Sequence, residues 1–204
     1  MARFTTQNIL TAAFAECSCV CLVGEDVWTI RHPMGGEFQV HRFNTGLEQW
    51  QEVAFQRPAS IRMDEYDARN PCKAAVSGEN IFFVSRIDSV KLMTVLNTTT
   101  RQWSEVMTAP LANFVVKNNN AFFDCGKELV VKSMETHQQV SIPMPHHFEQ
   151  FKHHNLLVAN SSVFLIKVDS AGRRVVHKLD ERENKFVRIS TDNISFWKRQ
   201  KNFI

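Results

Sequence analysis

The stretch Val76-Ser77-Gly78-Glu79-Asn80-Ile81-Phe82-Phe83 is repeated in similar form at residues 22–29, 116–123 and 158–165. In every copy an apolar run ends, a Gly or an Asn follows, and an apolar residue and an aromatic resume shortly afterwards. Gly and Asn tolerate the positive φ of a tight reversal, while β-branched and aromatic residues favour strands. The pattern therefore predicts four β-hairpins. Their expected turn residues are Gly24, Gly78, Asn118 and Asn160.

A second landmark follows each hairpin in the same order. A polar residue closes a third apolar run, and a residue that is aromatic in three of the four copies comes six positions later. The polar residues are Asn44, Asn97, Ser133 and Asp180, and the later residues are Trp50, Trp103, Gln139 and Phe186. Successive hairpins lie 54, 40 and 42 residues apart. A period in this range is typical of propeller blades and similar arrays, so each repeat is predicted to hold four short strands.

These landmarks divide the chain. Four repeats are predicted at about 17–55, 72–110, 113–145 and 155–190. The preceding segment, 1–16, is interpreted either as a strand that completes a blade or as a short loose helix. The C-terminal tail, 191–204, carries several large apolar side chains, so we expect it to pack on the domain or to begin a further repeat.

The composition is that of an ordinary water-soluble chain, with 44% hydrophobic and 22% charged residues among 204. No apolar run is long enough for a transmembrane helix. The net charge of +3 is too small to predict nucleic-acid binding by itself. The compact basic cluster at 198–201, close to Phe196 and Trp197, keeps nucleic-acid binding as an alternative.

The cysteines and histidines do not predict a metal site or another cofactor. Cys17, Cys19 and Cys21 alternate along one expected strand, which suits small buried apolar side chains better than a disulfide. This usage indicates a reducing compartment, and we expect a cytoplasmic protein. The histidine pairs at 146–147 and 153–154 have no carboxylate or thiol at a metal-binding spacing. We interpret them as part of a polar crossover.

The landmarks resemble those of kelch repeats. In 95–103 a strand closed by Asn97 is followed six residues later by Trp103, and Asn44 and Trp50 repeat this spacing. The resemblance covers residues 17–190 and implies an all-β fold, a kelch-like β-propeller of about four four-stranded blades. It departs from the family because Gly35-Gly36 lies several residues late for the family's diglycine. Four blades imply either a small or partly open propeller, or a fragment or shortened relative of a larger one. An open propeller would expose two blade faces and favour a homodimer.

Kelch propellers generally bind partner proteins through the loops between the second and third strands and through the links between blades. Here the resemblance places those loops at 32–37, 85–90, 125–128 and 169–173. The expected partner-binding residues are His32, Met34, Arg57, Arg62 and Arg86. The three arginines are chosen because guanidinium groups pair well with the carboxylates of an acidic partner.

The predicted function is a non-enzymatic protein-interaction module. No BTB or F-box segment precedes the repeats, so we expect any role as an adaptor in a ubiquitin-ligase system to need another subunit. The alternative is a propeller enzyme of the oxidase or sialidase type. Those enzymes need tyrosine ligands or a tyrosine nucleophile with an arginine triad, and the one tyrosine, Tyr66, lies in a linker.

Overall fold

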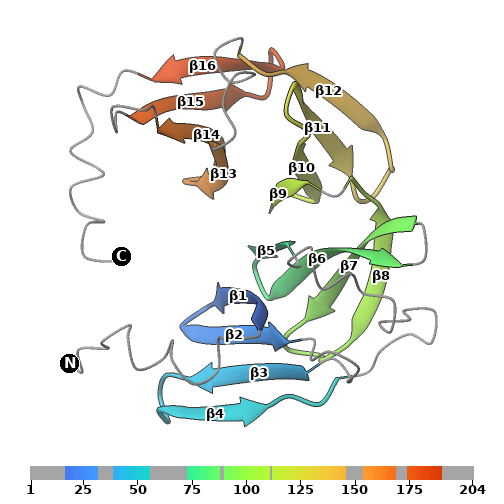
Figure 1. Ribbon diagram of the computed structural model, residues 1–204, viewed down its shortest axis with the longest axis vertical. Coiled ribbons are helices and arrows are strands. Elements are labelled where there is room, and N and C mark those ends of the chain that lie inside the picture. Colours follow the sequence, from blue (N-terminus) through green and yellow to red (C-terminus); the bar gives the residue numbers. More distant parts are fainter. Residues whose placement is uncertain are drawn as a thin grey trace. The chain divides into compact units, whose positions relative to one another are not determined.

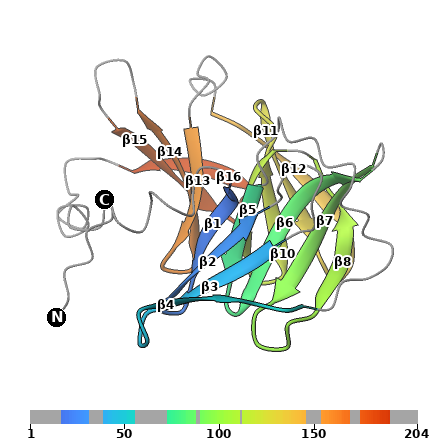
Figure 2. The same cartoon turned by 60° about the horizontal axis from the view of Figure 1, so that its bottom comes forward.

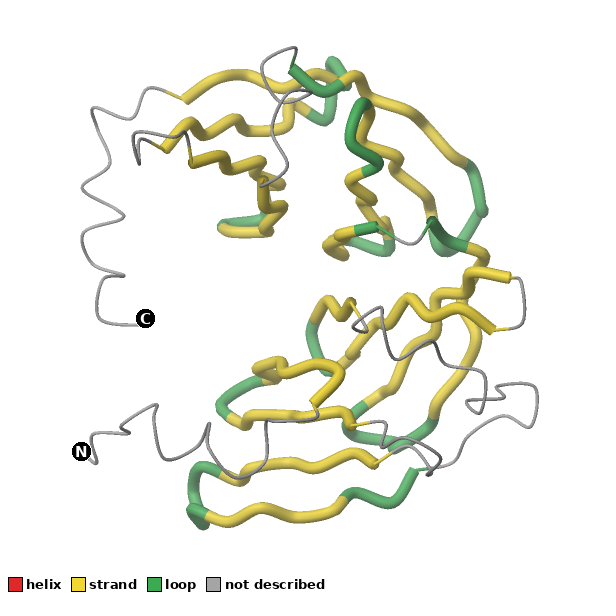
Figure 3. Tube along the Cα trace, in the orientation of Figure 1, coloured by secondary structure: helices red, strands yellow, loops and turns green. Residues whose placement is uncertain are grey.

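The computed structural model describes residues 17–31, 39–55, 73–87, 90–110, 112–145, 154–168 and 174–189. Every regular element in these ranges is a strand, and the strands form four separate four-stranded antiparallel sheets (Figures 1 and 3). We number the sheets I to IV in chain order. The predictions of an all-β chain and of four strands in each repeat are confirmed. The segments 1–16 and 190–204 lie outside the described residues.

The chain divides into two compact units, an N-terminal unit of residues 1–112 and a C-terminal unit of residues 113–204. The N-terminal unit holds sheets I and II, whose strands pair in chain order (Figures 1 and 2). Sheet I consists of β1 (Cys17–Val23), β2 (Asp26–Arg31), β3 (Gln39–Asn44) and β4 (Gln49–Glu52). Sheet II consists of β5 (Lys73–Ser77), β6 (Asn80–Ile87), β7 (Val90–Asn97) and β8 (Trp103–Thr108).

The C-terminal unit repeats this arrangement with sheets III and IV. Sheet III consists of β9 (Asn113–Lys117), β10 (Asn120–Asp124), β11 (Glu128–Ser133) and β12 (Gln139–Pro143). Sheet IV consists of β13 (His154–Ala159), β14 (Ser162–Val168), β15 (Arg174–Asp180) and β16 (Lys185–Ile189). All neighbouring strands are antiparallel, so each sheet is a simple meander.

The first turn of every sheet has two residues, but its geometry differs between the units. Gly24 and Gly78 have φ values of 62° and 59°, and the following Glu25 and Glu79 are not left-handed. This is the type II′ pattern, which requires positive φ at the first central residue alone. In the C-terminal unit both central residues are left-handed, as Asn118 and Asn119 show with φ values of 47° and 58°. That is type I′, which Asn tolerates.

The four polar landmark residues all cap the turn between the third and fourth strands. Asn44 Oδ1 accepts a hydrogen bond from the N–H of Leu47 at 2.9 Å, and Ser133 Oγ accepts one from Thr136 at 3.1 Å. Asn97 Oδ1 accepts from the two N–H groups at positions 99 and 100, and Asp180 Oδ1 from those at positions 182 and 183. Short polar side chains satisfy such turn N–H groups well. The recurring Asn, Ser or Asp is therefore explained by turn geometry.

The residue six positions after each landmark lies directly opposite the residue before it. Trp50 faces Phe43, Trp103 faces Leu96, and Phe186 faces Leu179 across their strand pairs. Four left-handed residues make this register possible, because each stands at the same position in its turn. They are Glu48, Arg101, His137 and Asn184, with φ values of 52°, 58°, 58° and 48°.

Within each unit the two sheets pack face to face around an apolar core. In the N-terminal unit Trp28 and Ile30 of sheet I meet Ile81, Phe83 and Trp103 of sheet II. The Trp103 ring lies 5.3 Å from Phe83, which is an ordinary aromatic packing distance. In the C-terminal unit the core residues come from both sheets in the same way. They are Phe122, Leu129, Ile142 and Met144 of sheet III or the segment after it, and Val163, Leu165 and Leu179 of sheet IV.

The expected cysteine row lies on β1, and the strand has an irregularity there. The register of β1 against β2 shifts between Cys17 and Cys19, because Cys17 pairs with Arg31 while Cys19 pairs with Ile30. Cys21 is half-buried and packs against the core of the N-terminal unit.

Candidate functional site

The two ends of each sheet differ in how regular their connections are. At the turn end, the first turn always has two residues. The second turn always has four residues between its backbone-paired ends, which are residues 44 and 49, 97 and 102, 133 and 138, and 180 and 185, and the last of the four is always left-handed. At the opposite end, which we call the linker end, the connections between the second and third strands span 32–38, 88–89, 125–127 and 169–173. The links between sheets also begin and end there and vary still more in length. The four repeats therefore differ in the length of their connections mainly at the linker end.

Most of the predicted partner-binding residues lie outside the described part of the chain. This applies to His32 and Met34, and to Arg57 and Arg62 in the link between sheets I and II. Arg86 lies within β6, and the prediction of a loop over 85–90 is corrected there. The pairs Arg86–Lys91 and Ile87–Val90 extend the β6–β7 hairpin. β-Branched Ile87 and Val90 favour this extension over an open loop.

Arg86 pairs with Lys91 across β6 and β7 at the linker end of sheet II, so this sequence-predicted residue belongs to the hairpin itself.

The connection between β10 and β11 is the predicted loop that the structure describes in full. Gly126 adopts a φ of 86° and donates its N–H to Asp124 Oδ1 at 3.0 Å. Lys127 accepts a backbone hydrogen bond from Met144 at 3.0 Å, which ties the turn to the segment that follows β12. The turn presents Cys125, Lys127 and Glu128 as exposed residues. It is a compact, hydrogen-bonded part of the linker end.

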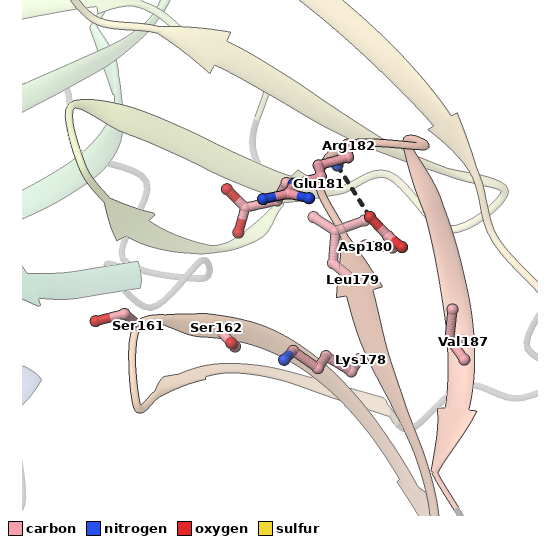
Figure 4. Close-up of a pocket in the computed structure, with 8 residues that line it drawn as sticks. All are labelled: Ser161, Ser162, Lys178, Leu179, Asp180, Glu181, Arg182 and Val187. Carbon is pink, nitrogen blue, oxygen red and sulfur yellow. Dashed lines mark hydrogen bonds between the residues drawn. The ribbon is translucent and has the colours of Figure 1, made fainter.

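Sheet IV carries an open pocket of about 720 Å³ at its turn end (Figure 4). The first turn of the sheet contributes Ser161 and Ser162 to it. The remaining lining residues come from β15, from the turn after it and from β16: Lys178, Leu179, Asp180, Glu181, Arg182 and Val187. Figure 4 shows the ammonium end of Lys178 directed toward Ser162. Sequence reasoning missed this pocket because only strand register brings these distant residues together.

The acidic side chains of the pocket already have bonding partners, whereas its cationic side chains have none among the described residues. Glu181 forms an ion pair with Lys117 of β9, which is 9% exposed, and so links sheets III and IV. Asp180 caps the turn through the N–H groups of residues 182 and 183. Within the described ranges, the side chains of Lys178 and Arg182 have no ion pair or hydrogen bond. The pocket therefore offers positive charge and two serine hydroxyls to an acidic group.

A further ion pair lies beside the pocket. The Glu183 carboxylate accepts a hydrogen bond from Lys185 and, through this bond and its charge, raises the pKa of the Lys185 ammonium above its ordinary value. Lys185 therefore stays charged at neutral pH. Among the described residues there is no group of three or more His, Cys, Asp or Glu side chains that could hold a metal ion. Those residues also contain no helix suited to crossing a membrane.

Comparison with known proteins gives a likeness in fold alone. No family model matches the sequence, and no curated protein matches it. A solved structure with the same fold is that of TolB from Acinetobacter baumannii, a β-propeller, with a TM-score of 0.50 and 8% sequence identity. The match covers 81% of this chain and 40% of the TolB chain. It confirms the predicted propeller fold class, in which sheets I to IV are the blades.

Proposed function

We propose that this chain is a non-enzymatic protein-binding module of the kelch-like type, and that its partner contacts the linker ends of the sheets. The observation that carries this proposal is the contrast between the two ends. Counted between backbone-paired residues, the turns at the turn ends keep the same lengths and the same left-handed positions in all four sheets. The linker ends differ in every sheet, as expected where a rigid scaffold presents variable binding segments.

The charge at the linker end supports an acidic partner. Arg86 and Lys91 are opposed there, and Arg57 and Arg62 belong to the long link that leaves the same end of sheet I. Guanidinium groups bind carboxylates through paired hydrogen bonds, which gives both affinity and direction. We include in the proposal a cytoplasmic setting and a role as a recognition subunit, which in a ubiquitin-ligase system would require a second protein for catalysis.

The experiment compares proteins captured by the intact chain and by charge-reversed variants. Arg57→Glu, Arg62→Glu and Arg86→Glu change the linker end. Arg101→Glu is a matched control, because Arg101 is exposed at the turn end and Glu48 occupies the equivalent position in sheet I. We expect the linker-end variants to lose a captured protein that the intact chain and Arg101→Glu both keep. Identical capture by all five proteins would refute the proposed binding end.

A further inference from the structure

The repeat positions that form the pocket on sheet IV also exist in sheet I, where they hold an ion pair. Arg42 of β3 lies opposite Trp28, the third residue of β2, just as Lys178 of β15 lies opposite Phe164, the third residue of β14. Arg42 Nε donates to the carboxylate of Asp26, the first residue of β2, at 2.7 Å, and the two groups form an ion pair. In sheet I the cation at this position therefore has its own acid.

Sheet IV keeps the cation but lacks this acid. Ser162 is the first residue of β14 and is therefore the counterpart of Asp26. Figure 4 shows the ammonium end of Lys178 directed toward Ser162, whose hydroxyl carries no charge. Among the described residues, Lys178 has no ion pair or hydrogen bond. An anion bound beside Ser162 would take the place that the Asp26 carboxylate has in sheet I.

A second cation, Arg182, lines the same pocket and is particular to this repeat. It stands two residues after Asp180, and the corresponding residues of sheets I to III are Gly46, Thr99 and Glu135. These three turns have the same left-handed position without a cation at this place, so the turn itself does not require one. The Arg182 side chain is exposed and, like Lys178, has no ion pair or hydrogen bond within the described part of the chain.

The acidic side chains around the pocket do not neutralise these two cations. Glu181 pairs with Lys117, and Glu183 pairs with Lys185. Asp180 Oδ1 accepts hydrogen bonds from the N–H groups of residues 182 and 183. Asp180 keeps its negative charge, so it weakens the attraction of the pocket for an anion but leaves the pocket with an excess of positive charge.

We propose that this cationic pocket binds the phosphate group of a phosphate monoester. Such a group carries a charge of about −1.5 to −2 at neutral pH and three strong acceptor oxygens, which suit two cations and the hydroxyls of Ser161 and Ser162. A carboxylate has one charge and two oxygens, and it would leave some of these donors unused. The volume of about 720 Å³ is larger than a phosphate needs, and Leu179 and Val187 line the remainder, so the ester has an apolar body. The site lies at the turn end and does not depend on the function proposed for the linker end.

An NMR titration of the isotope-labelled chain with phenyl phosphate tests the proposal, because the amides that shift also locate the site. We expect saturable shifts at Ser161 and Arg182, and we expect benzoate, the matching carboxylate, to bind at least about tenfold more weakly. Lys178→Gln and Arg182→Gln should each weaken the binding of phenyl phosphate by about tenfold or more. Arg101→Gln is the matched control, because it removes the same charge from the turn end of sheet II. It should leave the affinity within about twofold of the parent.

Asp180→Asn provides a gain of affinity that a loss of structure cannot imitate. Asn97 Oδ1 caps the equivalent turn of sheet II, so Asn at position 180 keeps the cap and removes one negative charge from the pocket. Phenyl phosphate should bind this variant about two- to fivefold more tightly than the parent.

A short phosphoserine peptide distinguishes the two sources of such an ester. Tighter binding of the peptide than of phenyl phosphate identifies a phosphorylated protein as the ligand, and weaker binding identifies a small phosphate ester. The absence of saturable binding of phenyl phosphate up to about 10 mM overturns the proposal. So does equal affinity for benzoate, an unchanged affinity in Lys178→Gln, or a weaker affinity in Asp180→Asn.

Discussion

The stability of the turn between β7 and β8 follows from the hydrogen bonds of Asn97, and replacing this residue by Ala tests that dependence. Asn97 Oδ1 accepts from the N–H groups of Thr99 and Thr100 at 3.1 and 2.8 Å. Asn97 Nδ2 donates to Asn80 Oδ1 at 2.9 Å, across the strand pair. Oδ1 also accepts from the exposed Thr100 hydroxyl at 3.1 Å, and this hydroxyl regains water when the acceptor is removed. Asn97→Ala removes all four bonds without disturbing the apolar core.

The expected cost is worked from the exposure of each bond. The two N–H groups of the turn are exposed and regain water, so they account for about 0.5 kcal/mol each. The bond to Asn80 is partly buried and contributes about 1 kcal/mol. Asn97→Ala should therefore lower the free energy of unfolding by about 2 kcal/mol. Asn44→Ala in the equivalent turn removes one exposed bond, to Leu47, and should cost about 0.5 kcal/mol.

Urea unfolding followed by tryptophan fluorescence measures both effects, because Trp28, Trp50 and Trp103 all lie in the N-terminal unit. Asn97→Asp keeps the oxygen acceptor, and the fourth repeat uses Asp180 in the same role. Because it loses the Nδ2 donor to Asn80, it should cost about 1 kcal/mol, half the cost of Asn97→Ala. If Asn97→Ala costs no more than Asn44→Ala, the number of capping bonds does not set the stability of these turns and the reasoning is wrong.

Three further predictions use the same unfolding assay, with circular dichroism where the C-terminal unit is probed. Phe83→Ala should cost about 3–5 kcal/mol because Phe83 is 1% exposed, whereas Val187→Ala should cost less than about 0.5 kcal/mol because Val187 is 46% exposed; similar costs would contradict this difference in burial. His137→Gly should stabilise by about 0.5–1 kcal/mol by relieving a left-handed residue, and Asn184→Gly should change little because Asn tolerates that conformation; the reverse order would contradict this explanation. Glu181→Ala should cost about 2 kcal/mol because it strips the partner from buried Lys117, and Lys117→Met should cost less; an equal cost would show that the ammonium is not desolvated.

The candidate binding residues were only partly predictable from sequence. Arg86 lies at the linker end of sheet II but within β6 rather than in the predicted loop, because Ile87 pairs with Val90, and its role in binding stays a prediction. The choices of His32, Met34, Arg57 and Arg62 lie outside the described residues and stay predictions. The cationic pocket on sheet IV had no signal in the sequence, because Ser161, Lys178 and Arg182 become neighbours only through strand register.

The sequence by itself determined the features that depend on neighbouring residues. Gly24 and Asn118 specify tight turns through their tolerance of positive φ, and Asn97 or Asp180 specifies a capped turn through its own side-chain oxygen. These preferences act over a few residues and recur with the repeat, so the turn positions could be predicted directly from the sequence.

Only the tertiary structure decided which faces of the sheets are covered. Trp103 and Trp50 occupy the same position in their repeats, yet Trp103 lies in the core of the N-terminal unit, whereas Trp50 lies outside that core beside Phe43. The bulge at Cys17, the pairing of Lys117 with Glu181 and the exposure of Leu22 likewise depend on strands distant in the chain. Burial is a property of what packs against a residue, and an identical local pattern therefore leaves it undetermined.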